Sequence, residues 1–202
     1  MATALPFIVF TGRPAAGKSS ILEVICSEFD TPIKPAKSTT TRKSRGDEKD
    51  GEYDFVSEQT FHKMDAEGFL AWKAQPYGPS TPWYGTTLEE VQSGLRYGNR
   101  IAILSRDSPS MLYAMAKKLG LERRICYIHF DTGKEDVDHI LRERMKERTD
   151  QDRVSAQLFE SRNWDGDARA SGLPYHFVNA LQPQRILLAR ILRIITRHPA
   201  FN

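Results

Sequence analysis

A short stretch near the start of the chain has the residue types and spacing of a loop that binds phosphate groups. Gly12 and Gly17 occupy its first and sixth positions, and Lys18 follows. Glycine lets consecutive backbone N–H groups approach polyphosphate oxygens, and the lysine carries a mobile positive charge to the β- and γ-phosphates. The hydroxyl of Ser19 is placed to complete the coordination of Mg²⁺. The residues of this predicted nucleoside triphosphate site are Gly12, Arg13, Pro14, Ala15, Ala16, Gly17, Lys18, Ser19 and Ser20.

A strand and a helix must position such a loop, whereas a chance match in a glycine-rich turn would not need them. Residues 5–11 form a continuous apolar run, which is typical of a central strand buried on both faces of a parallel sheet. Residues 19–29 have apolar side chains at helical spacing, so the positive end of this helix faces the bound anion. Apolar runs at 101–104 and 125–130 predict further strands. We therefore expect an α/β fold with a P-loop NTPase-type parallel sheet core and helices on both faces.

The composition limits the class of protein and its partners. The 202 residues, of which 40% are hydrophobic and 27% charged, suit one globular domain. A net charge of +3 argues weakly for an anionic partner, and a small phosphorylated ligand accounts for it as well as nucleic acid does. Cys26 and Cys126 match neither a zinc site nor a redox pair. Because no signal peptide or membrane span is recognisable, we expect a cytoplasmic protein that binds neither membrane nor nucleic acid.

A second group of residues suited to phosphate lies between residues 34 and 51. Lysines and arginines are interleaved there with serines and threonines, and Arg42 and Arg45 stand three positions apart. Most such charged runs are solvated loops. Guanidinium groups, however, grip phosphate through two parallel hydrogen bonds, and the triphosphate already has its own loop. The alternative to a solvated loop is therefore a site for a phosphorylated acceptor.

Motifs spaced along the chain resemble those of the guanylate kinase family. The segments STTTRKSR at 38–45 and YDFVS at 53–57 are similar to the family's acceptor-binding pattern S-x-T-T-R-x-x-R-x-G-E-x-x-G-x-D-Y-x-F-V-S. The segments GFLAW at 68–72 and YGT at 84–86 follow in the same order as in the family. The resemblance covers nearly the whole chain.

The resemblance implies roles for side chains in three groups. The residues implied to hold the phosphate of the acceptor are Arg42, Arg45, Tyr53 and Tyr84, and those implied to lie at its base are Ser38, Thr86 and Asp107. The arginines implied to close as a lid over the phosphates and to act in catalysis with Lys18 are Arg144, Arg148 and Arg153. Asn179 is implied to lie near the adenine of ATP. For the lid segment, the competing interpretation is a solvated helix with glutamate–arginine pairs.

The chain departs from the family pattern at positions that bear on the acceptor. Ala71 stands where the family has a glutamate that accepts hydrogen bonds from guanine. Losing such bonds reduces the preference by roughly ten- to a hundredfold each, so guanine specificity is in question. The connection 75–83 is longer than in the family and rich in proline and aromatic residues. It either supplies Gln75, Tyr77 or Trp83 as replacement contacts or is a rigid surface loop.

Another departure concerns the metal. Ser105 replaces the first of two family aspartates, of which Asp107 is the second. Since that first aspartate assists the metal in the family, we expect Mg²⁺ to depend more on Ser19, water and the phosphates of the nucleotide.

Local patterns predict helix starts and one buried histidine. Thr86-x-x-Glu89 has the form of a capping box, and Asp107 is placed to cap the helix that follows it. His129 alternates with apolar residues, so we expect a hydrogen-bonded histidine of the core or of a sheet edge rather than a catalyst.

The resemblance as a whole implies one guanylate-kinase-like domain over residues 1–202. Its expected parts are a core (1–34, 99–132 and 164–202), an acceptor-binding subdomain (35–98) and a lid (133–163). The implied reaction is Mg²⁺-dependent phosphoryl transfer from ATP to a nucleoside monophosphate, with GMP or dGMP as the best single acceptor, in a monomer or homodimer. A kinase of the same fold for another monophosphate or a sugar phosphate is the runner-up. A non-catalytic interaction module is the alternative of another class, against which the intact phosphate-binding loop argues.

Overall fold

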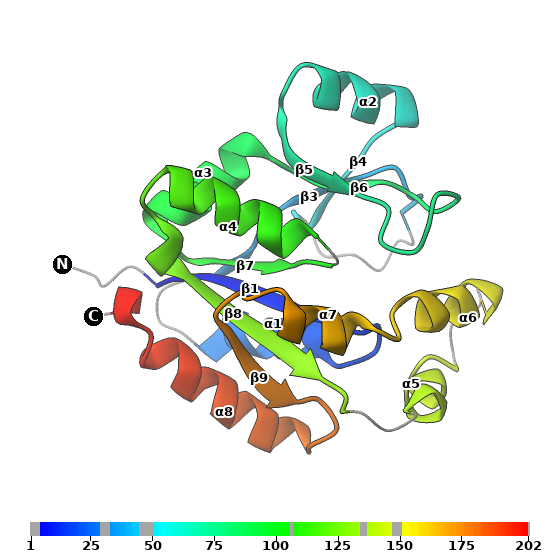
Figure 1. Cartoon of the computed structure of the whole chain (residues 1–202), viewed down its shortest axis with the longest axis vertical. Helices are drawn as coiled ribbons and strands as arrows, with labels where there is room; N and C mark the ends of the chain where they lie inside the picture. Colours follow the sequence, from blue (N-terminus) through cyan, green and yellow to red (C-terminus); the bar gives the residue numbers. More distant parts are fainter. Residues whose placement is uncertain are drawn as a thin grey trace.

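Figure 1 shows a computed structural model of the chain, which describes residues 5–28, 33–44, 51–105, 107–133, 137–146 and 151–201. Of residues 28, 151–153 and 201 it describes the backbone alone. The strands of the central sheet are β1 (Phe7–Gly12), β2 (Lys34–Pro35), β7 (Arg100–Ile103), β8 (Ile125–Asp131) and β9 (Tyr175–Asn179). In this part of the chain the sheet has five strands, all parallel, in the order β2-β7-β1-β8-β9.

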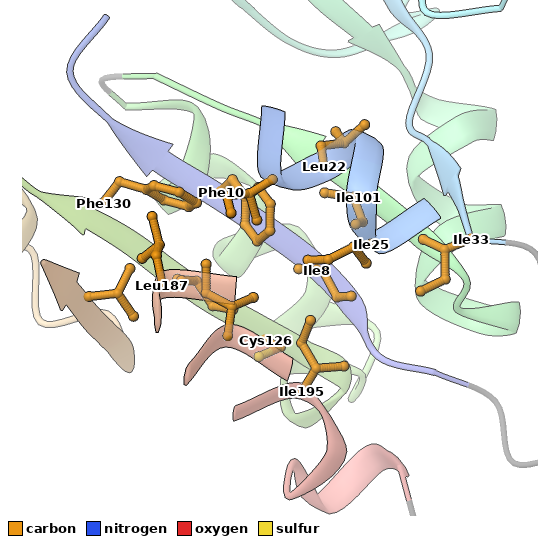
Figure 2. Packing of buried hydrophobic residues seen from close by; sticks show 14 of the residues in the cluster. Ile8, Phe10, Leu22, Ile25, Ile33, Ile101, Cys126, Phe130, Leu187 and Ile195 are labelled. Carbon is orange, nitrogen blue, oxygen red and sulfur yellow. The ribbon is translucent and has the colours of Figure 1, made fainter. Parts of the chain in front are cut away.

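Helices α1 (Lys18–Glu28) and α8 (Gln184–Thr196) cover one face of the central sheet (Figure 2). Ile8 and Phe10 of β1 point to this face and pack with Ile25 of α1 and Ile195 of α8. Apolar residues four apart along each helix lie on one side of it, which is why both helices bury a single stripe. Each fully buried isoleucine or leucine there contributes about 1.5–3 kcal/mol relative to an exposed one.

Helices α3 (Leu88–Tyr97) and α4 (Ser108–Lys118) cover the opposite face. Phe7 and Val9 of β1 alternate with the residues that face α1, so they point to this second side and pack with Leu95 and Leu112. Both faces of β1 and β8 are therefore buried, and the predicted α/β fold with helices on both faces is confirmed.

A second sheet is formed by residues between 38 and 87. Its strands are β3 (Ser38–Thr40), β4 (Tyr53–Phe55), β5 (Leu70–Ala74) and β6 (Tyr84–Thr87), in the order β4-β3-β6-β5, and helix α2 (Glu58–Ala66) belongs to the same segment. Strand β5 is irregular, because Leu70 pairs with Thr87 while Trp72 pairs with Thr86. Two residues of β5 therefore span one residue of β6, and Ala71 is the extra residue.

Helices α5 (Asp138–Arg144), α6 (Gln151–Glu160) and α7 (Trp164–Ala170) lie near the end of the sheet toward which β8 points (Figure 1). A small apolar cluster that includes Leu141 of α5 and Leu158 of α6 joins the first two helices, and Ala15 packs against it. Short 3₁₀ turns at Glu122–Arg124 and Pro199–Phe201 complete the described elements. Within the residues that the structure describes, we find no helix with the length and apolar character of a membrane span.

Two predicted helix starts differ from the observed ones. Helix α3 is capped by Thr87, whose hydroxyl accepts a hydrogen bond from the Glu90 backbone N–H at 3.2 Å, so the predicted box at Thr86 and Glu89 was wrong by one residue. Thr86 remains in β6 because it pairs with Trp72. Asp107 precedes α4, but its side chain makes no capping hydrogen bond.

Candidate functional site at the phosphate-binding loop

The predicted phosphate-binding loop lies between the end of β1 and the start of α1, as the sequence indicated. Its backbone needs glycine at the point where it leaves the sheet. Gly12 has a φ of 131°, and a Cβ there would lie 2.6 Å from the carbonyl oxygen of Phe130 in β8. A side chain cannot fit into this space, so only glycine lets the loop leave β1 this close to β8. The loop then leads directly into the positive N-terminal end of α1.

Lys18 is held by the loop itself. Its Nζ donates hydrogen bonds of 2.7 Å to the carbonyl oxygens of Gly12 and Arg13. Burial lowers the pKa of Lys18 from 10.5 to about 7, against the opposing effect of the Asp165 carboxylate. An anion bound in the loop would favour the charged ammonium group and reverse this shift.

One cleft beside the loop, which we call the α8 cleft, has a volume of about 470 Å³. Arg144, one of the predicted lid arginines, lines it and donates from Nη1 to the carbonyl oxygen of Ala15 at 3.1 Å. Asn179 is not among its lining residues, and its Oδ1 accepts a hydrogen bond from the Leu181 N–H at 2.8 Å. The lining residues are Ala15, Ala16, Gly17, Lys18, Ser19, Ser20, Ile21, Arg144, Ala180, Gln182, Gln184 and Leu187.

A second cleft that the loop also lines, which we call the β5 cleft, has a volume of about 250 Å³. Lys18, Ser19 and Ala15 line both clefts. The structure brings into the β5 cleft five residues that the sequence predicts at the acceptor, namely Ser38, Arg42, Tyr53, Tyr84 and Thr86. The loop therefore separates two polar compartments and contributes the same lysine and serine to each.

Arg42 is a cation of the β5 cleft that two aromatic rings surround. It is buried, and its guanidinium carbon lies 4.6 Å from the ring centroid of Tyr53 and 5.0 Å from that of Phe55. Its Nη1 donates to the carbonyl oxygen of Lys43 at 3.0 Å. Burial raises the pKa of the Tyr53 hydroxyl more than the neighbouring guanidinium lowers it, so this hydroxyl stays protonated and can donate to an anion.

Several predicted residues are not placed in these clefts. Arg45 and Arg148 lie outside the described residues, and so does the side chain of Arg153. Asp107 lines a neighbouring cavity of about 390 Å³, which adjoins the β5 cleft at Ser105 and Trp164.

The irregularity in β5 decides which side chains form the wall of the β5 cleft. Trp72 pairs with Thr86 and Ala74 pairs with Tyr84, and all four line the cleft. Ala71 does not line it. The position at which the chain departs from the family pattern is therefore absent from the lining of this cleft, whereas its neighbour Trp72 is part of it.

The long connection after β5 forms part of the same wall. Tyr77 lines the β5 cleft and stacks on Trp164 of α7, with ring centroids 5.8 Å apart. Gln75 instead bonds within the connection, donating from Nε2 to the carbonyl oxygens of Pro79 and Thr81 at 3.0 and 2.7 Å. Trp83 stacks on Phe61 at 6.0 Å. Of the three candidates in this connection, Tyr77 is the one that lines the cleft.

Sequence reasoning missed Trp164 and Gln157, which line the β5 cleft from the opposite side. Both belong to the segment that follows α5, and Gln157 lies on the buried side of α6. No motif recognised in the sequence contains either residue. For Gln157 the sequence did contain a signal, because at helical spacing this residue lies on the same side of α6 as the apolar Val154 and Leu158.

A buried polar network lies beneath the loop. The Thr11 hydroxyl and the Nδ1 atom of His129 are 2.7 Å apart, and Nε2 of His129 is 2.8 Å from Asp165. The same carboxylate accepts hydrogen bonds from the N–H and hydroxyl of Thr132 at 3.0 and 2.6 Å. These bonds lower the pKa of Asp165, although burial opposes them. His129 is thus the hydrogen-bonded core histidine that the sequence predicted.

The residues at the loop fit a Mg²⁺ site of the kind in which the nucleotide supplies most ligands. The exposed Ser19 side chain lies at the start of α1 between the two clefts. Among the described residues no group of three histidine, cysteine or carboxylate side chains is arranged to hold a metal ion. Mg²⁺ retains several waters and is often bound by substrate phosphates with one or two protein ligands, and the Ser19 hydroxyl is a group of the kind that fits such a site.

Residues 5–163 match the family model described as "Guanylate kinase". Over 112 residues the chain is 33% identical to a guanylate kinase of Campylobacter jejuni, a match that covers 54% of this chain and 52% of that protein. Over 97 residues it is 38% identical to a guanylate kinase of a Polaromonas species, covering 47% and 45% of the two chains. The chain thus spans about half the length of the relatives it matches.

Among solved structures, the crystal structure of a guanylate kinase from Anaplasma phagocytophilum is similar over most of its length. The TM-score is 0.59 at 16% sequence identity, and the match covers 98% of this chain and 90% of that one. This likeness concerns the fold.

Proposed function

This chain belongs to the guanylate kinase family, and from that premise we propose that it transfers the γ-phosphoryl group of ATP to the phosphate of a nucleoside monophosphate. The observation that carries the proposal is that one phosphate-binding loop lies between two clefts and contributes Lys18 and Ser19 to both. We assign ATP to the α8 cleft and the acceptor to the β5 cleft. In the same proposal the second sheet is the acceptor-binding subdomain, and α5 and α6 form the lid.

The proposed transfer needs no side chain as nucleophile, because an oxygen of the acceptor phosphate attacks the γ-phosphorus and ADP leaves. The protein contributes position and positive charge. Lys18 contacts the phosphates at the boundary of the two clefts, Arg42 and the hydroxyls of Tyr53 and Tyr84 hold the acceptor phosphate, and Arg144 approaches from the lid. Ser19, with water and the nucleotide, would hold Mg²⁺, which supplies neutralising charge when bound.

GMP or dGMP, giving GDP or dGDP, is the first candidate acceptor. The family and the predicted base contacts Ser38 and Thr86, which line the β5 cleft, support it. Hydroxyl groups can both donate to and accept from the edge of a base.

A different acceptor is the second candidate, and one observation favours it. Among the described residues, no aspartate or glutamate lines the β5 cleft, and β5 contributes Trp72 and Ala74 to its lining. Guanine presents ring N–H and amino donors that a carboxylate accepts, so their burial without such an acceptor is unfavourable. Another nucleoside monophosphate or a sugar phosphate would not present this pair of donors together.

Release of ADP, measured with ATP, Mg²⁺ and a panel of acceptors, tests these candidates. The panel contains GMP, dGMP, AMP, CMP, UMP and ribose 5-phosphate. Turnover that is highest with GMP or dGMP supports the first candidate, whereas turnover with another member alone supports the second. If no member of the panel is turned over, the proposed kinase activity is overturned and a non-catalytic interaction module is favoured.

A carboxylate introduced at Ala74 should increase the selectivity for guanine. Ala74 lines the β5 cleft and is the last residue of β5. A substitution there changes the lining of the cleft without replacing Trp72 or another core residue. We expect Ala74→Glu to raise the ratio of kcat/KM for GMP to that for AMP by about tenfold relative to Ala74→Gln. The glutamine variant controls for size. An equal ratio in both variants would show that the base does not lie against β5.

Binding of ATP should be accompanied by proton uptake above pH 7. Lys18, with its pKa lowered to about 7, is mostly neutral at pH 8.5 in the empty loop, and phosphate oxygens favour its protonated form. Titration calorimetry at pH 8.5 in buffers of different ionisation enthalpy should show uptake of about one proton per ATP, falling toward zero near pH 6. Uptake that persists unchanged in Lys18→Met would assign the proton to another group.

The same pKa gives the sign of the pH dependence of stability. Between pH 7 and 10 the unfolded chain binds the lysine proton that the folded chain has released. The contribution of Lys18 to the free energy of unfolding of the empty protein therefore rises with pH over this window.

A further inference from the structure

The side chain of Arg13 faces the lid helices rather than either cleft. Arg13 is 5% exposed, although it belongs to the predicted triphosphate site. Its Nη2 forms an ion pair with the carboxylate of Asp138 and donates to the carbonyl oxygen of Leu158 in α6 at 3.2 Å. Any contact of this residue with phosphate is therefore made by its backbone.

Asp138 is the first residue of α5, and it accepts from two arginines. Besides Arg13, the exposed Arg162 donates from Nε to its Oδ2 at 2.9 Å and forms an ion pair with the same oxygen, to which its Nη2 lies 2.8 Å away. Burial would raise the pKa of the Asp138 carboxyl, but the hydrogen bonds from the two arginines outweigh this and lower it. The carboxylate is therefore ionised at neutral pH and fixed between the loop and the segment that follows α6.

The loop contacts α5 at both ends of the helix. Asp138 at its start pairs with Arg13, and Arg144 at its end donates to Ala15 two residues further along the loop. Since a helix of this length rises by about 10 Å, the two contacts fix both its position and its direction. Leu141, between them, is fully buried against Met145 and Leu158.

We propose that Arg13 and Asp138 are positioning residues that hold the lid helix α5 so that Arg144 stays at the α8 cleft. This inference rests on the proposed function, in which Arg144 neutralises charge on the transferred phosphoryl group. The ion pair couples the loop that binds ATP directly to the helix that carries the arginine. A buried guanidinium that loses its carboxylate partner is unfavourable, so the helix shifts when the pair is broken.

The test combines Asp138→Asn with Arg144→Met. Asp138→Asn keeps the size of the side chain and should lower kcat about tenfold with less than a twofold change in the KM of the acceptor. In the Arg144→Met background the same change should lower kcat by less than twofold, because the positioned group is already absent. Independent, multiplicative effects of the two substitutions would contradict the proposal, since general destabilisation acts equally in both backgrounds.

Hydrogen exchange provides a second measurement that needs no turnover. With ADP bound, amide exchange in residues 138–144 should be at least tenfold faster in Asp138→Asn and in Arg13→Gln than in the unchanged protein. The matched control is Glu143→Gln, an exposed residue of the same helix that pairs with Lys146. Unchanged exchange in both variants overturns the positioning role. Failure of every acceptor in the turnover assay would overturn the proposed function while this measurement still decides whether Arg13 and Asp138 dock α5.

Discussion

Replacing Lys18 by methionine is expected to lower kcat for phosphoryl transfer by about a thousandfold. Lys18 lines both the α8 cleft and the β5 cleft. In the proposed reaction its ammonium group therefore lies where negative charge moves from the acceptor to the leaving ADP. No other described cation lines both clefts, and methionine keeps most of the length and apolar stem of lysine. Steady-state kinetics with saturating ATP and acceptor measures the effect.

The control for this variant is Lys117→Met, which removes an exposed lysine of α4 far along the chain from the loop. It should change kcat by less than twofold. Thermal unfolding checks that Lys18→Met is folded, because the lysine also donates to the carbonyl oxygens of Gly12 and Arg13. If folded Lys18→Met retains turnover within tenfold of the unchanged protein, the loop is not the centre of the reaction.

The elements that hold the loop were predictable because each is specified locally. A run of apolar residues such as Phe7–Phe10 can be buried on both faces only between two layers of helix, and the glycine and lysine spacing after it identifies the loop. Ser38, Arg42, Tyr53, Tyr84 and Thr86, which the resemblance implies at the acceptor, also come together around one cleft. Four of them lie on the strands β3, β4 and β6 of one small sheet, and Arg42 follows β3. Arg45 and Arg148 lie outside the described residues and stay predictions.

The wall of the β5 cleft was not predictable, and the reason is register. The motif around residues 68–72 draws attention to Ala71, whereas Trp72 and Ala74, which follow the irregular pairing of β5 with β6, are the residues of β5 that line the cleft. An extra residue in one strand exchanges the faces of the side chains beyond it, and nothing in the sequence marks it.

Contacts between segments that are distant in the chain could not be predicted from the sequence either. Arg13 is separated from Asp138 by 125 positions and His129 from Asp165 by 36, so neither pair forms a local motif. Arg13 was assigned to the nucleotide because it lies within the loop sequence, whereas burial against α6 directs its side chain to the lid. Such pairs form only when distant elements pack together, so no local sequence pattern predicts them.

Replacing Arg42 by methionine is expected to raise the KM of the acceptor by about a hundredfold while the KM of ATP changes by less than threefold. Arg42 lines the β5 cleft and is absent from the lining of the α8 cleft. Two charge-assisted hydrogen bonds to one phosphate, each worth about 1.5 kcal/mol or more, account for the size of the effect. Methionine can still pack on the rings of Tyr53 and Phe55, so the fold should be retained.

Two further variants separate charge from geometry at this position. Arg42→Lys keeps the positive charge but lacks the planar fork of the guanidinium group. Its KM for the acceptor should therefore be lower than that of Arg42→Met by no more than about tenfold. Lys43→Met, which removes an exposed neighbouring charge, should leave the KM of both substrates within twofold. An equal rise in the KM of ATP and of the acceptor in Arg42→Met would mean that the β5 cleft is not a separate site for a phosphorylated acceptor. A rise confined to the acceptor would support that assignment for any acceptor in the panel, because a phosphate group is common to all of them.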